Sequence, residues 1–285
     1  MAARKPIIAL MYDFDKTLCT KDMQEYTFIP KLGIKPKAFW TESGKLAKEQ
    51  NMDSILAYMY LMIRKASGAQ QSIHREDFVK LGKDIELFPG VIDWFSRISA
   101  FGKAQGVNIK HYIISSGLKE IIQGTSIAQY FEEIYACEFH YDENNVADWP
   151  AVAMNYTAKT QFLFRINKGV TEIYENNRLN AFTPEDERPV PFRNMIYFGD
   201  GLTDVPCMKL VKVNGGKSVA VYKHKRKVEP LIRDGRVDYI MPADYSEGKD
   251  LEELVQSIIV QMAANDKLYR KAQQQYKQVM KKDKQ

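Results

Sequence analysis

Residues 7–17 read Ile-Ile-Ala-Leu-Met-Tyr-Asp-Phe-Asp-Lys-Thr, a run of six apolar or aromatic residues that ends abruptly in two acids. A short, uninterrupted apolar run is typical of a strand buried on both faces, as in a parallel sheet flanked by helices. In such sheets, ligands bind beyond the carboxyl ends of the strands. The stretch therefore predicts a buried first strand, Ile7–Tyr12, with Asp13 and Asp15 at the ligand-binding edge.

The same pattern recurs along the chain. Short apolar runs separated by segments of helical spacing occur at residues 110–114, 133–137, 195–198, 218–221 and 238–241. Alternating strands and helices predict an α/β fold with a Rossmann-like parallel sheet.

One segment, residues 20–87, interrupts this alternation, because it contains helical spacing but no run typical of a buried strand. Its clearest helical face consists of Ile55, Tyr58, Met59, Met62 and Ile63. Such a stripe indicates helix packing more often than a ligand pocket. We therefore expect an inserted all-helical cap (20–87), an α/β core formed by residues 1–19 and 88–265, and a basic helical tail (266–285). The polar stretch 169–191 is expected to be an exposed loop with one helical turn.

Composition excludes several classes of protein. The chain has 285 residues, 45% of them hydrophobic, and no apolar run near the roughly 20 residues that span a bilayer. Cys19, Cys137 and Cys207 show no paired spacing, which argues against a zinc site or a disulfide framework. These features predict a reduced, cytoplasmic protein.

The net charge of +5 is concentrated locally. Residues 267–285 contain seven Lys or Arg and one acid, and a second basic cluster follows a strand at Lys223–Lys227. Either could contact nucleic acid or acidic lipid. We interpret both as solvated surface, and expect neither a nucleic-acid nor a membrane partner.

The two aspartates after the first strand are the first chemical signal. Two carboxylates so close together resist ionising together. A divalent cation resolves this conflict, and Mg²⁺ prefers oxygen ligands while leaving positions for water and phosphate. The alternative is that Asp13 and Asp15 only cap the following helix.

Two later strands end in similar polar residues. Ser115-Ser116-Gly117 offers a hydroxyl and backbone N–H groups suited to phosphate, although an ordinary helix N-cap would look the same. Gly199–Asp204 places Asp200 at a strand end and Asp204 one turn later. These acids could complete and support a metal site, or could belong to a simple Gly-Asp turn.

Phosphoryl transfer also needs a cation that offsets the negative charge of the transferred group. Lys159 begins a helical stretch before the fourth strand, and Lys168 lies near its end. We favour Lys159, with Lys168 as the alternative.

Taken together, these segments resemble the haloacid dehalogenase superfamily. Its phosphatases carry Asp-x-Asp-x-Thr, a strand-end Ser or Thr, a Lys, and Gly-Asp-x-x-x-Asp, in that order. The chain has all four, in Asp13–Thr17, Ser115, Lys159 and Gly199–Asp204.

The resemblance implies specific roles for the acids. Asp13 would be the nucleophile, and Asp15 the general acid and base. Mg²⁺ would be held by the carboxylates of Asp13 and Asp200 and the backbone carbonyl of Asp15, with Asp204 in support. Dehalogenases of the family lack an acid at the position of Asp15, so this residue favours phosphate monoesters.

The resemblance also implies how substrate is held. Ser115 and Lys159 would bind the phosphate oxygens, near the amides of Ser116 and Gly117. A phosphomutase of the same superfamily, or a non-catalytic phosphate-binding protein, remains the alternative.

The helical insert resembles the cap of the phosphoserine-phosphatase-like branch. Such a cap implies a small phosphorylated metabolite as the substrate. Phosphoserine phosphatase has a glutamate that reads the substrate amine, whereas Asp22 is a shorter possible substitute here. Lys21 beside it suits an acidic substrate instead.

Overall fold

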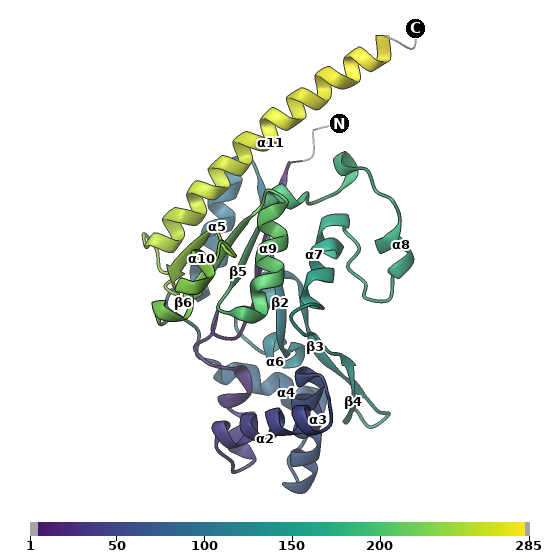
Figure 1. Cartoon of the computed structure of the whole chain (residues 1–285), viewed down its shortest axis with the longest axis vertical. Coiled ribbons are helices and arrows are strands. Elements are labelled where there is room, and N and C mark those ends of the chain that lie inside the picture. Colours follow the sequence, from purple (N-terminus) through teal and green to yellow (C-terminus); the bar gives the residue numbers. More distant parts are fainter. Residues whose placement is uncertain (1–4, 283–285) are drawn as a thin grey trace.

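The computed structural model describes residues 5–282, so the outermost residues of the expected core and tail, 1–4 and 283–285, lie outside the described residues. A seven-stranded sheet with the order β4-β3-β2-β1-β5-β6-β7 forms its centre (Figure 1). The strands are β1 (Ile7–Tyr12), β2 (Asn108–Leu118), β3 (Phe131–Tyr141), β4 (Ala147–Val152), β5 (Met195–Gly199), β6 (Lys217–Tyr222) and β7 (Tyr239–Pro242).

The central strand β1 aligns the sheet. All six of its residues are buried, and it pairs in parallel with both β2 and β5. In this register Tyr12 lies opposite Ile113 on one side and Phe198 on the other. The residues that follow these three therefore emerge together at one end of the sheet, called here the carboxyl edge.

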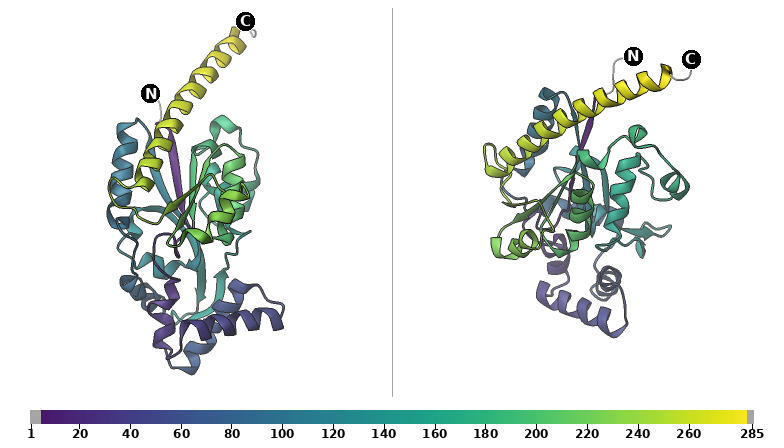
Figure 2. Two further views of the ribbon diagram at one scale, coloured as in Figure 1. Left: turned by 60° about the vertical axis from the view of Figure 1, so that its left-hand side comes forward. Right: turned by 45° about the horizontal axis from the view of Figure 1, so that its top comes forward.

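Helices cover both faces of the sheet (Figure 2). The helices α5 (Val91–Ala104) and α11 (Asp250–Lys282) lie on one face. The other face is covered by α7 (Lys159–Lys168), α9 (Val205–Val213) and α10 (Glu229–Arg233). The short helix α6 (Lys119–Gln123) follows β2. This arrangement is the predicted α/β fold.

The segment between β1 and α5 contains helices and connecting turns only, apart from isolated bridge residues, within residues 20–87. Its helices are α1 (Phe28–Lys31), α2 (Pro36–Glu49), α3 (Ser54–Gly68) and α4 (Arg75–Leu81), with 3₁₀ turns at Met23–Glu25 and Gly82–Asp84. They gather at the end of the molecule opposite the far end of α11 (Figure 1). On α3, Tyr58, Met59 and Met62 are buried, as expected of a packed helical face.

This helical segment, the cap, leaves and rejoins the core through two adjacent passages of chain. The Thr20 N–H donates to the carbonyl of Glu86 (3.0 Å), and the Phe88 N–H donates to that of Leu18 (2.9 Å). Cys19 and Leu87 form an isolated antiparallel bridge between them. We call these two passages, 18–20 and 86–88, the cap hinge.

The sheet contains one strand that the sequence did not predict. β4 pairs antiparallel with β3 at the edge of the sheet. Only Ala147 of its six residues is buried, Trp149 is 70% exposed, and it contains Pro150. A strand that buries almost no side chains lacks the apolar run used to detect strands, and edge strands tolerate proline.

The remaining expectations concern the surface. The stretch 169–191 forms a loop with one short helix, α8 (Asn176–Asn180), and a 3₁₀ turn at Glu185–Glu187. Helix α11 runs without a break through residue 266 and extends beyond the body (Figure 1). No helix within residues 5–282 combines the length and apolar character needed to cross a membrane.

A buried histidine links β1, β2 and α5. His111 Nδ1 lies 3.1 Å from the Tyr12 hydroxyl, and Nε2 lies 3.1 Å from the Ser99 hydroxyl. Burial lowers the pKa of His111 to about 3. In the unfolded chain a histidine takes up a proton near pH 6.5, so only the unfolded state gains it as the pH falls from there.

We therefore expect that lowering the pH decreases the free energy of unfolding more in the wild type than in His111→Gln. Between pH 7 and pH 5 the difference should amount to about 2 kcal/mol. Urea denaturation at both pH values measures it. Equal losses in the two proteins would contradict a neutral buried imidazole.

Candidate active site

Three acids meet at the carboxyl edge. Asp13 follows β1, Asp200 follows β5, and Asp204 ends the 3₁₀ turn Leu202–Asp204. Each offers a carboxylate oxygen, and these oxygens lie within 4.8 Å of one another. The parallel register of β1 and β5 brings Asp13 and Asp200 together, as the positions of both acids after buried strands predict.

A single buried cation, the ammonium of Lys159, joins two of these acids. Lys159 begins α7, and its Nζ donates to Asp13 Oδ1 (2.9 Å) and Asp204 Oδ1 (2.8 Å). Burial alone would lower the pKa of Lys159, but the two carboxylates raise it above its ordinary value. The lysine therefore stays charged.

The alternative lysine lies elsewhere. Lys168 ends the same ten-residue helix, about 14 Å along the axis from Lys159 at 1.5 Å per residue. Its Nζ donates to the carbonyls of Leu179 and Ala181, both at 2.7 Å. It therefore holds the 169–191 loop, and Lys159 is the lysine at the acids.

The position of Asp204 is fixed from several sides. Its Oδ1 also accepts a hydrogen bond from the Tyr197 hydroxyl (2.9 Å), and its Oδ2 accepts one from the Asp200 N–H (3.2 Å). A Cβ atom on Gly199 would lie 2.4 Å from the Asp204 carboxyl carbon. Only glycine at 199 lets Asp204 fold back against the end of β5.

The three acids carry more negative charge than Lys159 offsets. Burial raises the pKa of Asp13 to about 6 despite the opposing effect of Lys159. Burial, and then the charges of Asp204 and Asp13, raise the pKa of Asp200 to about 7. A cluster of carboxylate oxygens with unbalanced charge has the donor chemistry that Mg²⁺ requires, so these residues could hold that ion.

Asp15 lies apart from the three-acid cluster. Its Oδ1 accepts hydrogen bonds from the Met23 N–H (2.8 Å) and the Cys19 thiol (3.6 Å), both near the start of the cap. Burial raises its pKa well above the ordinary value, and nearby Asp22 adds to the shift. The role of its backbone carbonyl as a metal ligand stays a prediction.

Near the end of β2, Ser115–Gly117 are held by their own groups and by the cap. The Gly117 N–H donates to Ser115 Oγ (3.0 Å), and Ser116 Oγ donates to the Met154 carbonyl (2.7 Å). From cap helix α3, the Tyr58 hydroxyl donates to the Ser116 carbonyl (2.7 Å). The cap thus contacts the segment predicted to bind phosphate.

Two further residues beside the site were not identified from the sequence. Lys16 adopts a left-handed backbone conformation (φ 58°), and its Nζ pairs with Asp22. The Met23 side chain lies against Gly117, where a Cβ would approach its Cε to 2.0 Å. Lys16 stands inside the predicted motif, but the motif treats its position as variable.

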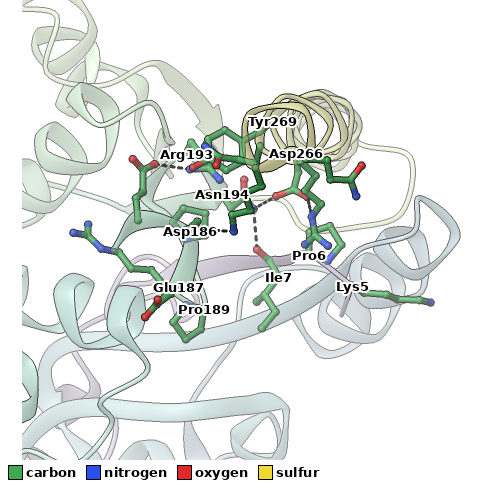
Figure 3. A pocket seen from close by; sticks show the side chains of 17 residues that line it. Lys5, Pro6, Ile7, Asp186, Glu187, Pro189, Arg193, Asn194, Asp266 and Tyr269 are labelled. Atoms are coloured by element: carbon green, nitrogen blue, oxygen red, sulfur yellow. Dashed lines mark hydrogen bonds and ion pairs between the residues drawn. The ribbon is translucent and has the colours of Figure 1, made fainter. Parts of the chain in front are cut away.

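Two cavities flank the sheet at opposite ends. One, of about 320 Å³, opens beside Asp200. The other, of about 430 Å³, lies near the start of β1, under α11 (Figure 3). Two of its basic side chains pair with acids, in Arg193–Glu185 and Lys277–Asp186. Of the two, only the first cavity borders the acid cluster.

The comparisons with known proteins identify the family and agree with the fold. The family model of haloacid dehalogenase-like hydrolases matches residues 10–209. The chain therefore belongs to the haloacid dehalogenase-like hydrolase family.

Relatives extend the match over most of the chain. An uncharacterized protein of Borreliella burgdorferi is 29% identical over 279 residues, which cover 88% of this chain and 96% of that protein. A HAD family hydrolase from Salmonella enterica serovar Typhi superposes with a TM-score of 0.56 at 20% identity, covering 86% of this chain and 73% of its own. A phosphoserine phosphatase in a phospho-aspartyl intermediate analogue form gives 0.54 at 16% identity, covering 89% and 99%. At these identities the structures establish the fold alone.

The charge imbalance at the three acids yields a prediction for Asp200→Asn. Without divalent ions this variant should unfold at a higher temperature than the wild type, because a repelling carboxylate is removed. Added Mg²⁺ should stabilise the wild type by about 2.7 kcal/mol at 100 times the dissociation constant, and the variant far less. Thermal unfolding with Mg²⁺ or with EDTA measures both effects.

Glu143→Gln is the matched control, since Glu143 is an exposed acid in the turn between β3 and β4 and does not belong to the cluster. It should respond to Mg²⁺ like the wild type. Equal stabilisation of Asp200→Asn and the wild type would place the ion elsewhere.

Proposed function

We propose that the chain is a Mg²⁺-dependent phosphatase that transfers the phosphate of a small monoester to Asp13 and then to water. The observation that carries the proposal is the Lys159 ammonium buried between Asp13 and Asp204, with Asp200 beside them. In such an arrangement at the carboxyl edge, a carboxylate can act as the nucleophile. The buried cation offsets the negative charge of the phosphate.

Asp13 is suited to be the nucleophile. Its pKa of about 6 leaves the carboxylate ionised at neutral pH. Lys159 holds Oδ1 and so orients the carboxylate, and Oδ2 is the oxygen that would attack phosphorus. Attack forms the Asp13–phosphate bond as the bond to the leaving alkoxide breaks.

The negative charge on the phosphoryl oxygens would be stabilised by cations and by a hydrogen-bond donor. Bound Mg²⁺ would neutralise charge and orient the reacting groups in line. Lys159 supplies a fixed positive charge at the same place, and Ser115 supplies a hydroxyl at the end of β2.

Asp15 is suited to proton transfer. A carboxyl group whose pKa is raised by burial is protonated more readily, so it can donate to the leaving alkoxide. The resulting carboxylate can then take a proton from the water that hydrolyses the phosphorylated Asp13. The Met23 N–H orients this carboxyl group through Oδ1.

The cap favours a small substrate. It contacts the end of β2 through Tyr58, and a cap over a site of this kind excludes water and large molecules. Solved phosphoserine phosphatases share the fold, which supports phosphate monoesters as the substrate class. Asp22 is paired with Lys16, so it does not offer an unpaired acid for a substrate amine.

The test uses p-nitrophenyl phosphate with Mg²⁺. Asp13→Asn should lower turnover by more than about 10³-fold, because the nucleophile is lost. Lys159→Ala should lower it about 10²- to 10³-fold, whereas Lys168→Ala, at the other end of α7, should leave it nearly unchanged. Release of inorganic phosphate measures all three.

Two results would contradict the proposal. Turnover that appears only with an added bisphosphate would indicate a phosphomutase. Binding of inorganic phosphate without any turnover would indicate a phosphate-binding protein.

A further inference from the structure

The cavity beside Asp200 has one wall at the start of the cap and another at the loop after β6. Its volume is about 320 Å³, at the small end of ligand pockets. The residues that line it are Lys16, Thr20, Lys21, Asp22, Glu25, Phe88, Asp200, Val221, Tyr222, Lys223, His224, Lys227 and Val228.

This cavity borders the proposed reaction centre. Asp200 belongs both to the three-acid cluster and to the cavity lining. A molecule whose phosphate lies at Asp13 can therefore extend its remaining atoms past Asp200 into the cavity. A bound cation at the cluster would offset the charge of Asp200, so this carboxylate would not repel an acidic group.

The charged groups of the cap-side wall already have partners. Lys16 pairs with Asp22, Glu25 accepts a hydrogen bond from the Trp40 indole (2.8 Å), and the Lys21 ammonium lies 5.3 Å from the centre of the Tyr26 ring. These contacts largely satisfy the cap side of the cavity.

The opposite wall is different. Lys223 and Lys227 are exposed, and within residues 5–282 their side chains form no ion pair and no hydrogen bond. No acid stands within the run Lys223–Lys227, so these charges repel one another. An anionic group in the cavity would relieve that repulsion.

The cavity under α11 provides a contrast. It contains comparable numbers of basic residues, but Arg193 pairs with Glu185 and Lys277 pairs with Asp186 (Figure 3). At the cavity beside Asp200, by contrast, Lys223 and Lys227 face the proposed reaction centre and form no ion pair with any described residue.

We infer that this cavity receives a second anionic group of the substrate, held by Lys223 and Lys227. The inference rests on the proposed phosphatase function and narrows its substrate class. The substrate is a small phosphate monoester with a carboxylate or a second phosphate. This group stays intact while the monoester bond is hydrolysed.

The test compares three substrates with one carbon skeleton: glycerol phosphate, phosphoglycerate and glycerol bisphosphate. The wild type should hydrolyse at least one of the two acidic compounds with a higher kcat/KM than glycerol phosphate. The better of the two identifies the second group as a carboxylate or a phosphate.

The double variant Lys223→Ala/Lys227→Ala should lower kcat/KM for the preferred acidic substrate about tenfold or more, chiefly through KM, because charge-assisted hydrogen bonds are lost. Its activity on glycerol phosphate should stay within about twofold. Lys225→Ala/Arg226→Ala is the matched control, since it removes two charges from the same loop outside the cavity lining. It should leave both activities unchanged.

Binding gives an independent readout. Titration of phosphoglycerate or glycerol bisphosphate into Asp13→Asn, which is not expected to turn over, should show weaker binding when Lys223 and Lys227 are also replaced. Equal effects of the double variant and its control would overturn the inference and leave the phosphatase proposal intact. So would a wild type that favours glycerol phosphate. Failure to hydrolyse any of the three compounds or p-nitrophenyl phosphate would overturn both.

Discussion

The site depends on one buried charge, the ammonium of Lys159 between Asp13 and Asp204. Burying like-charged carboxylates together is unfavourable unless a cation compensates them. The same contacts fix the start of α7 against the ends of β1 and β5. One lysine therefore reduces the repulsion within the acid cluster. It also joins three elements of the core that are distant in sequence.

The parallel register supplies the geometry that this interaction needs. Because β1 lies between β2 and β5, the residues after all three strands meet at one edge. The cap then adds contacts that the sheet cannot provide. Tyr58 reaches the Ser116 carbonyl, and the Met23 N–H holds Asp15. The core thus fixes the positions of the three acids, and the cap holds the neighbouring groups, Asp15 and Ser116, in place.

Sequence patterns predicted six of the seven strands, most clearly β1 and β5, which are continuous runs of buried residues. They also predicted that Asp13 and Asp200 meet, since both follow such strands. β4 escaped detection because it buries almost nothing. The contact of Tyr58 with Ser116 could not be predicted, since helical spacing identifies a buried face but not the atom that its hydroxyl meets. The left-handed conformation of Lys16 has no signature in residue type, because lysine rarely adopts it.

The cap hinge has a consequence for how such a chain can change. Residues 20–87 depart and return through neighbouring, hydrogen-bonded passages, so the two ends of the cap lie side by side at the core. A unit attached in this way acts as a loop with adjacent ends. The conformational entropy lost on closing such a loop increases only slowly with its length. Its helices can diverge, lengthen or be exchanged over evolutionary time while the pairing of β1 with its neighbours stays the same.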